Sequence, residues 1–261
     1  MTDPRDLARR LEQTQWDTFW VPSDCTVIDR RELLMLACPS GAEYLNVVLR
    51  IDDTASLPNL LAEVARAHAG RDSRVHVAER QREHLVPALR DAGYEVTSEH
   101  HGYVRDTSLA APKTEATCER VTDMDGLLAW ERVNELAFGP GNTSTHAQRE
   151  HYLAQCADPG GRVHRFLSRI DGEPAAAGGM TLFPALDLAF LWGGGSVPAL
   201  RRRGAYAAVV SARAAFAAAR GIRVMGTFGR VATSGPILHR KGFTRLDTMD
   251  YWTRPASKSV G

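Results

Sequence analysis

Apolar residues recur along the chain with two different periods, and each period predicts one kind of element. Repeats of three to four residues predict helices over residues 6–19, 57–69, 82–92, 124–137, 145–157, 204–220 and 234–240. Short apolar runs predict strands over 33–37, 44–51, 74–78, 95–104, 163–170, 174–183, 188–197, 223–228 and 245–253. Asp171 and Gly172 suit the hairpin turn that joins two of these strands. The order predicts an α/β (α+β) protein in which mixed, mostly antiparallel sheets are flanked by helices.

The two halves of the chain end on the same order of elements. When the first half is shifted by 149 positions, nine residues within positions 60–105 fall on identical residues. One of them is Gly93, which falls on Gly242, and an aromatic residue follows each glycine. Two segments rich in alanine and arginine could match by chance, but here the element order agrees in the same register. We therefore expect two tandem lobes of one fold.

A small, polar segment at residues 107–117 separates the two patterned regions and is the expected linker. It divides the chain into an N-terminal domain over 1–106 and a C-terminal domain over 118–255, followed by a tail over 256–261. A chain of 261 residues is long enough for two domains, each with its own core.

Composition narrows the class of protein. Hydrophobic residues make up 44% of the chain and charged residues 24%, which is typical of globular proteins. The net charge of +1 gives no indication of a nucleic-acid partner. No apolar run is long enough to span a membrane, and the four cysteines show no metal-binding spacing. A cytoplasmic protein without a metal, a nucleic-acid partner or a membrane partner is expected.

The segment 191–220 carries the most informative chemistry. A strand ends in three consecutive glycines, and a turn with the sequence Arg201-Arg202-Arg203-Gly204 leads directly into an alanine-rich helix. The first N–H groups of a helix have no partner within it, and the helix dipole favours an anion at that end. Arginine side chains add charge-assisted hydrogen bonds, and glycine allows close approach to the backbone. This pattern predicts a diphosphate site.

The order Arg201-x-x-Gly204 before a helix resembles the acetyl-CoA motif of the GCN5-related N-acetyltransferases, which reads Gln/Arg-x-x-Gly-x-Gly/Ala. The sixth position is Tyr206 here, where the family has glycine or alanine. A Gly-Phe pair at Gly242 also resembles the end of the family's last helix. The first half lacks the basic turn and has Asp52 and Asp53 in its place. The resemblance thus implies a tandem protein whose N-terminal copy is degenerate and binds no cofactor.

The resemblance implies acetyl-CoA as co-substrate and places its contacts. Backbone groups at the end of the strand would pair with the pantetheine arm, and the basic turn would hold the pyrophosphate. Ser234 would bond the pantetheine or, equally, cap a helix. The implied binding residues are Gly195, Ser196, Val197, Arg201, Arg202, Arg203, Gly204, Ala205, Tyr206 and Ser234.

Catalytic residues are harder to place. The family's usual acid is a tyrosine on its last helix, but this chain has Leu238 at that position. Tyr206 is an alternative acid, or simply a packed aromatic ring. Four residues are candidate bases: Glu135, Glu150, His151 and Asp187, of which Asp187 is most simply a turn residue. Glu150 and His151 lie on the helix that borders the acceptor cleft in the family, unless they form a solvated helix face.

Together these features predict an N-acetyltransferase that acetylates a primary amine of a small molecule or peptide by direct attack in a ternary complex. Two alternatives remain open at this point. The chain could be a non-catalytic acyl-CoA-binding sensor, or an acyltransferase that acts on a hydroxyl group. It could function as a monomer or a homodimer.

Overall fold

The computed structural model describes residues 3–39, 43–52, 56–109, 114–139, 144–158 and 160–256. The chain forms two compact units, each of which is built from discontinuous segments. Unit 1 comprises Met1–Tyr103, Phe228–Arg240 and Thr244–Gly261, and unit 2 comprises Val104–Thr227 and Lys241–Phe243. Within the described residues, no helix combines the length and the apolar character that crossing a membrane requires.

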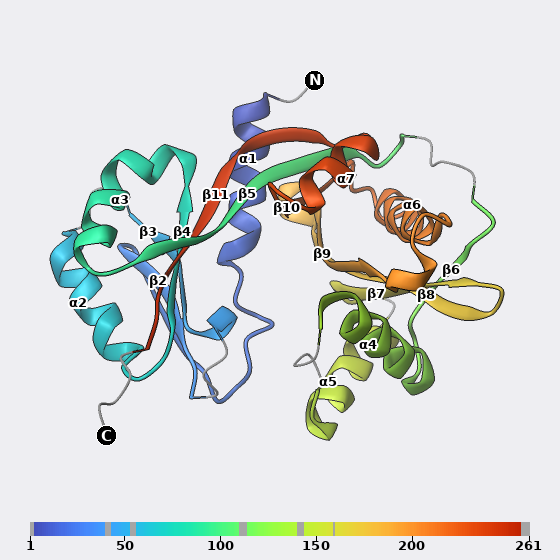
Figure 1. Cartoon of the computed structure of the whole chain (residues 1–261), viewed down its shortest axis with the longest axis horizontal. Coiled ribbons are helices and arrows are strands. Elements are labelled where there is room, and N and C mark those ends of the chain that lie inside the picture. Colours follow the sequence, from blue (N-terminus) through green and yellow to red (C-terminus); the bar gives the residue numbers. More distant parts are fainter. Residues whose placement is uncertain are drawn as a thin grey trace. The chain divides into compact units, whose positions relative to one another are not determined.

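Unit 1 contains a mixed sheet with helices on its faces (Figure 1). Its strands are β1 (Thr26–Arg30), β2 (Leu33–Ala37), β3 (Val47–Ile51), β4 (Ser73–Ala78), β5 (Glu95–Asp106) and β11 (Thr244–Arg254). They lie side by side in the order β1-β2-β3-β4-β11-β5. Its helices are α1 (Pro4–Gln13), α2 (Leu57–Ala67), α3 (Arg82–Asp91) and α7 (Ser234–Arg240).

Strand β2 shows how the sequence selects the two faces of this sheet. Successive side chains of a strand point to opposite faces. Leu33 and Met35 therefore pack with the apolar residues of α2 and α3. Leu34 and Leu36 lie on the other face, where Trp16 packs against them. Because both faces are covered, β2 is apolar throughout instead of alternating.

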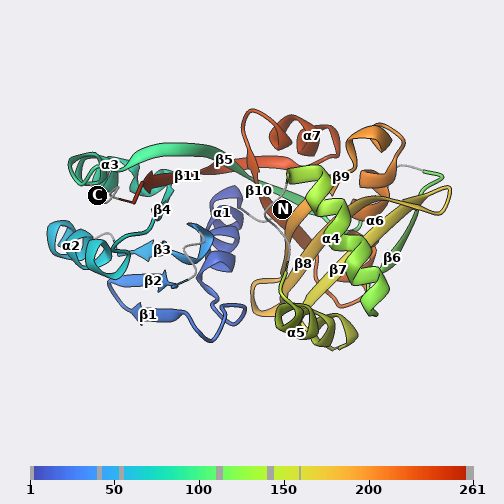
Figure 2. The same ribbon diagram turned by 60° about the horizontal axis from the view of Figure 1, so that its bottom comes forward.

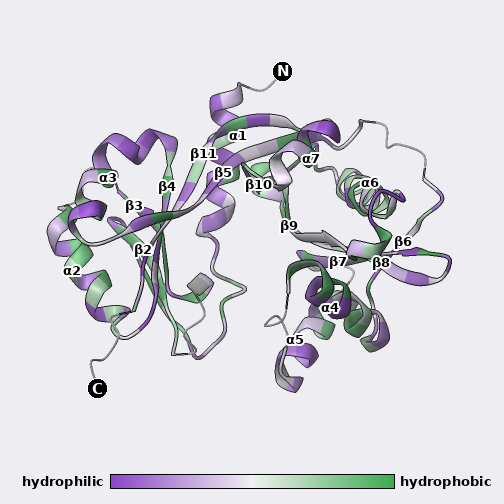
Figure 3. Cartoon of the chain, viewed as in Figure 1, coloured by the Kyte–Doolittle hydropathy of each residue, from purple (hydrophilic) through white to green (hydrophobic). Residues whose placement is uncertain are grey.

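The strands of unit 2 lie between two layers of helix (Figures 1 and 2). Its strands are β6 (Thr117–Arg120), β7 (Val163–Ile170), β8 (Glu173–Phe183), β9 (Leu188–Ser196) and β10 (Val224–Arg230), in the order β10-β9-β8-β7-β6. Helix α6 (Ala205–Ala218) covers one face, and α4 (Met124–Phe138) and α5 (His146–Ala157) cover the other. Figure 3 shows that α6 is largely apolar. Its many alanines suit a helix that packs on a sheet, where most of its surface is buried.

The structure repeats one order of elements, as the sequence predicts. The order β3-α2-β4-α3-β5 in the first half recurs as β9-α6-β10-α7-β11 in the second. Gly93 and Gly242 follow α3 and α7, and both have a φ of +80°. This left-handed conformation ends a helix at low cost only with glycine, which explains why both copies have it.

The compact units differ from the domains expected at 1–106 and 118–255. Strand β11, at the end of the C-terminal half, pairs antiparallel with β4 from Met249↔Ala78 to Arg254↔Ser73, inside unit 1. In unit 2, the Thr107 N–H donates to the carbonyl of Arg223. Each unit is therefore completed by backbone from the other half. Periodicity shows where a strand lies but not which distant strand it pairs with.

Several element bounds also differ from the prediction. The first helix ends at Gln13 instead of residue 19, and a 3-10 turn, Thr14–Trp16, follows it, with the Thr14 hydroxyl donating to the carbonyl of Leu11. Strand β1 was not predicted, because it is an exposed edge strand without an alternating apolar pattern. Strand β6 begins at the last residue of the expected linker, and residues 44–45 form a 3-10 turn instead of a strand.

Candidate functional site

The end of β9 is irregular in the way that its glycines suggest. The antiparallel register with β8 shifts between Ala177↔Gly195 and Gly179↔Trp192, so β9 carries a β-bulge. Gly193 lies in this bulge with a φ of +56°, which favours glycine. On its other side, β9 pairs with β10 in parallel only over Leu188–Phe190 within the described residues. Backbone groups of residues 193–196 are therefore left on that edge to pair with a ligand.

The other two glycines of β9 are required by packing. A Cβ atom on Gly194 would lie 3.1 Å from the ring of Tyr206. One on Gly195 would lie 2.7 Å from the Cβ of Ala137 and 2.9 Å from the ring of Phe138. Helix α6 therefore presses on one glycine and helix α4 on the next. Any larger residue at Gly195 would push α4 away from the strand.

The basic turn leads into α6 with an uncapped N-terminus. Arg202 and Gly204 both have left-handed backbone, with φ values of +65° and +90°. The first helical hydrogen bond runs from the Ala208 N–H to the Gly204 carbonyl, and no side chain caps the helix. The N–H groups of Ala205 to Ala207 thus have no partner within the helix. This is the local geometry on which the prediction of a diphosphate site rests.

The three arginines of the turn are exposed but differ in their partners. Arg203 donates from Nη2 to the Asp171 carboxylate at 2.8 Å, and both side chains are largely exposed. Such a surface ion pair contributes little stability. Arg201 and Arg202 form no ion pair with any described residue. They are the two guanidinium groups that remain available to an anion.

Gly204 is also required by its contact with the linker. A Cβ atom on Gly204 would lie 2.3 Å from the Oγ1 and 3.1 Å from the Cβ of Thr114. Real Cβ atoms do not approach other atoms so closely. The glycine therefore allows Thr114 to pack on the turn, in addition to any approach by an anion. A substitution at Gly204 would disturb this packing whether or not a ligand is bound.

Tyr206 lies on the face of α6 that packs against the sheet. Its ring lies on Gly194, and its hydroxyl lies close to the guanidinium of Arg213, two turns further along the helix. Arg213 is fully buried and donates from Nη1 to the carbonyl of Gly179 at 3.1 Å. Burial lowers the pKa of Arg213, and the neighbouring tyrosine opposes that shift. The ring of Tyr206 is therefore packed on the sheet, and its hydroxyl is held beside the guanidinium of Arg213.

Glu150 and His151 lie on the exposed face of α5. The Glu150 carboxylate is 3.4 Å from Nε2 of His146, one turn earlier. Nε2 of His151 is 3.1 Å from the side-chain nitrogen of Gln155, one turn later. Neither residue makes a hydrogen bond, ion pair or ring contact with a described residue of β9 or α6. The base assigned to this pair stays a prediction.

Ser234 and Leu238 belong to unit 1, on the short helix α7. Ser234 is the first residue of that helix and is half-buried. Leu238 is buried, and its Cδ1 lies 2.6 Å from where a Cβ of Gly229 would be. The ring of Tyr103 packs on the same glycine at 3.1 Å. The position that holds a tyrosine in the family is therefore a core position here, which a larger ring would overfill.

The structure also shows a cluster that sequence reasoning missed. Arg165 of β7 is buried, and its guanidinium carbon lies 4.5 Å from the ring centre of Tyr152, 5.4 Å from Trp130 and 5.3 Å from Trp192. Trp130 also lies 3.6 Å from where a Cβ of Gly193 would be. The cluster therefore forms the α4 side of the bulge in β9. Its members come from four elements, so no spacing in the sequence indicates it.

Unit 1 contains a cavity of about 600 Å³ at the carboxyl ends of β3 and β4. Asp52 lines it, whereas Asp53 lies outside the described residues. The charged lining is balanced between arginines and carboxylates, Arg5, Arg9, Arg50 and Arg80 against Glu12, Asp52, Glu79 and Asp247. The described lining therefore carries no surplus of either charge. Whether the first copy binds a ligand stays a prediction.

Comparison with known proteins identifies the fold. Neither a protein-family model nor a curated protein matches the sequence. A GCN5-related N-acetyltransferase from Kribbella flavida matches the structure with a TM-score of 0.71 at 18% identity, over 100% of this chain and 98% of that one. One from Sphaerobacter thermophilus matches with a TM-score of 0.60 at 15% identity, over 98% and 95% of the two chains.

A third structure bears on the tandem arrangement. A tandem GNAT protein from the clavulanic acid biosynthesis pathway matches with a TM-score of 0.63 at 13% identity, over 95% of this chain and 88% of that one. All three matches extend over both halves of this chain, so the likeness covers both copies of the repeat. At these identities the matches speak for the fold alone. The chain has the tandem fold of the GCN5-related N-acetyltransferases.

Proposed function

We propose that the protein transfers the acetyl group of acetyl-CoA to a primary amine of a small molecule or peptide, by direct attack in a ternary complex. One observation carries this proposal: the uncapped N-terminus of α6, preceded by left-handed backbone at Gly204 and by two exposed arginines that form no ion pair with a described residue. Free N–H groups and guanidinium groups together suit a diphosphate. Two of the structurally similar proteins are named N-acetyltransferases, which supports the same function.

The chemical groups present at this site suit the parts of acetyl-CoA that they would contact. The edge of β9 that β10 does not cover among the described residues offers backbone groups of Gly195 and Ser196 to the amide groups of the pantetheine arm. The backbone of Val197 is already engaged, because its N–H donates to the carbonyl of Ala175 and its own carbonyl accepts from the N–H of Leu200. Arg201, Arg202 and the first N–H groups of α6 would hold the pyrophosphate. Arg203 contributes less, because Asp171 already pairs with it. Ser234 would bond the pantetheine, as the family resemblance implies.

The reaction makes one bond and breaks one. The amine nitrogen attacks the carbonyl carbon, the C–S bond breaks, and the coenzyme leaves as a thiolate that takes up a proton. An alkyl amine is largely protonated at neutral pH, so a base must first remove its proton. We assign that role to Glu150 or His151. The Tyr206 hydroxyl is our candidate for returning a proton to the thiolate.

Calorimetry with coenzyme A tests the site. Arg201→Ala should weaken binding at least about tenfold, since a charge-assisted hydrogen bond contributes roughly 1.5–3 kcal/mol. Arg132→Ala removes the same charge from an exposed arginine on α4 and is the matched control. It should leave the affinity unchanged. Equal affinities for the two variants, or no heat with the unaltered protein, would contradict the proposed site.

Turnover is a separate question, because two observations favour an acyl-CoA sensor. Leu238 is buried where the family has its acid, and both candidate bases are exposed on α5. The assay follows release of the coenzyme thiol from acetyl-CoA across a panel of amines and matched alcohols. Thiol release with amines supports the N-acetyltransferase, and release with alcohols only indicates an O-acyltransferase. Tight binding without release from any acceptor would establish the sensor instead.

We also propose, from the sequence pattern and the family resemblance, what the N-terminal copy does and where and how the protein is assembled. We propose that the N-terminal domain, residues 1–106, holds no acetyl-CoA of its own, and that the protein is a cytoplasmic monomer or homodimer without metal, nucleic-acid or membrane partners. The number of coenzyme molecules bound per chain in the calorimetry tests the first part. One molecule per chain supports it, and two would contradict it.

A further inference from the structure

Two cysteines meet at the open end of the hairpin formed by β1 and β2. The strands pair antiparallel from Arg30↔Leu33 to Thr26↔Ala37. Continuing this register by one step places Cys25 directly opposite Cys38. Their sulfur atoms lie within 4.8 Å of each other, together with a carboxylate oxygen of Asp24. The separation of 13 positions between the cysteines gave no indication of this, because β1 itself was not predicted.

The pair occupies the kind of cross-strand site where side chains are nearest. In antiparallel strands, opposite residues that exchange no backbone hydrogen bonds have their side chains closer together. The Cys25 N–H donates to the carbonyl of Pro22, and the Cys38 N–H donates to Oδ1 of Asn46. Neither N–H is directed to the opposite cysteine. The extended register therefore places the two cysteines in the type of pair whose side chains lie closest, in agreement with the separation of at most 4.8 Å between their sulfur atoms.

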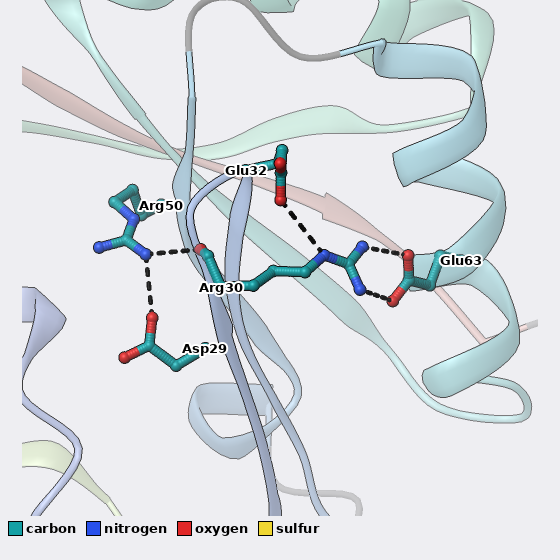
Figure 4. A network of polar contacts seen from close by, with 5 residues as sticks. All are labelled: Asp29, Arg30, Glu32, Arg50 and Glu63. Atoms are coloured by element: carbon teal, nitrogen blue, oxygen red, sulfur yellow. Dashed lines mark hydrogen bonds and ion pairs between the residues drawn. The ribbon is translucent and has the colours of Figure 1, made fainter.

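Side-chain contacts hold the rest of the hairpin in place, so the position of β1 beside β2 does not depend on the two cysteines (Figure 4). Near the turn, the Arg30 guanidinium forms two hydrogen bonds with the Glu63 carboxylate of α2. Arg50 of β3 donates to the Asp29 carboxylate at 2.9 Å and to the Arg30 carbonyl at 2.8 Å. These contacts hold the edge strand β1 at one end. The cysteines lie at the other end.

We propose that Cys25 and Cys38 form a redox-active thiol pair, which a low-molecular-weight disulfide such as oxidised glutathione converts into an intramolecular disulfide. The half-buried Cys25 attacks the glutathione disulfide and releases one glutathione thiolate. The buried Cys38 then attacks the sulfur of Cys25 and releases the second. Two protein thiols lose two protons and two electrons, and one glutathione disulfide is reduced to two thiols. This proposal is independent of the proposed acetyl transfer.

Burial determines the order and the speed of these steps. Cys38 is 1% exposed and Cys25 is half-buried, so the reagent reaches Cys25 first. Burial, with help from Cys38 and Asp24, raises the pKa of Cys25 to about 12. The thiol is therefore protonated at neutral pH, and exchange is slow because the thiolate is the nucleophile. In a reducing compartment the pair stays as two thiols and closes when the glutathione pool becomes oxidised.

The chain supplies its own internal comparison. The other two of its four cysteines, Cys118 and Cys156, lie in unit 2 on β6 and α5. Cys156 is buried, and burial raises the pKa of Cys118 to about 12 as well. Low thiolate content is thus common to Cys25 and Cys118. A selective loss of Cys25 and Cys38 would therefore follow from their geometry and not from acidity.

The test uses the full chain, oxidised with glutathione disulfide, unfolded, and alkylated before mass spectrometry. We expect free thiols to fall from four to two and the mass to drop by two hydrogens, without an added glutathione. Trypsin cleaves between the cysteines, so the cross-link should join the peptides 11–30 and 32–50. Reduction should separate them again.

Two variants keep the test decisive. Cys118→Ser should lose two of its three remaining thiols in the same way. Cys25→Ser should form no internal disulfide. If the unaltered protein instead carries glutathione on Cys25 while Cys38 stays free, or if both thiols persist under oxidation, the thiol pair is refuted. The peptide map of the unaltered protein gives this answer even if a variant fails to fold.

Discussion

Replacing Gly204 with alanine separates what the backbone requires from what a ligand requires. The residue has a φ of +90°, and a Cβ there would lie 2.3 Å from Oγ1 of Thr114. The left-handed conformation costs a non-glycine residue roughly 1–2 kcal/mol. Overpacking adds about 1–3 kcal/mol. We therefore expect Gly204→Ala to destabilise the fold by roughly 2–5 kcal/mol, before any effect on cofactor binding.

Gly221 provides the matched control at the other end of α6. Its φ is +74°, but nothing lies within 4 Å of where its Cβ would be. Gly221→Ala therefore carries only the conformational cost, and both substitutions gain the same few tenths to about 1 kcal/mol from a less flexible unfolded chain. The difference between the two variants, about 1–3 kcal/mol, isolates the contact with Thr114.

Urea denaturation followed by circular dichroism measures these differences. A double-mutant cycle with Thr114→Gly completes the design, because removing that side chain should abolish most of the excess cost. Equal losses in Gly204→Ala and Gly221→Ala would refute the reasoning. So would strict additivity with Thr114→Gly, since it would show that the two residues do not touch.

Three further outcomes follow from particular contacts. Asp171→Asn should strengthen binding of coenzyme A up to about fivefold in calorimetry, because it frees Arg203 from a surface pair; unchanged affinity would contradict this. Arg165→Lys should lower the free energy of unfolding by about 1–3 kcal/mol, because an ammonium cannot stack on three rings; an unchanged urea midpoint would contradict that. Burial lowers the pKa of His164 to about 4. Between pH 6.5 and 4 the unfolded chain therefore binds a proton at this histidine that the folded chain does not bind. His164 alone should therefore lower the free energy of unfolding by up to about 1.4 kcal/mol per pH unit between pH 6.5 and 4, and His164→Gln should reduce the slope by that amount.

Local pattern was sufficient for the kinds of elements and for the repeat. The hairpin at Asp171 and Gly172, the apolar helix after the basic turn, and the paired glycines 93 and 242 all lie where periodicity and turn chemistry place them. These features depend on residues close together in the chain. The sequence predicts too long a first helix, because Trp16 continues the apolar spacing although the α-helix ends at Gln13.

The candidate site was predictable only where it is local. The turn from Arg201 to Gly204 and the helix behind it form one continuous segment, so the sequence indicates the anion site by itself. The sequence does not show that Thr114 packs on Gly204, or that Asp171 pairs with Arg203. Those neighbours come from distant positions, and their contacts modify which residues of the motif are available.

The amino-acid sequence by itself determined most of the strands and helices, that two copies follow each other, and which helix presents free N–H groups behind a basic turn. Only the tertiary structure decided that β11 completes unit 1, that Arg165 is enclosed by three aromatic rings, and that Cys25 faces Cys38. The reason is physical. Periodicity records which face of an element is buried, whereas strand pairing and side-chain packing join residues whose separation along the chain carries no signal.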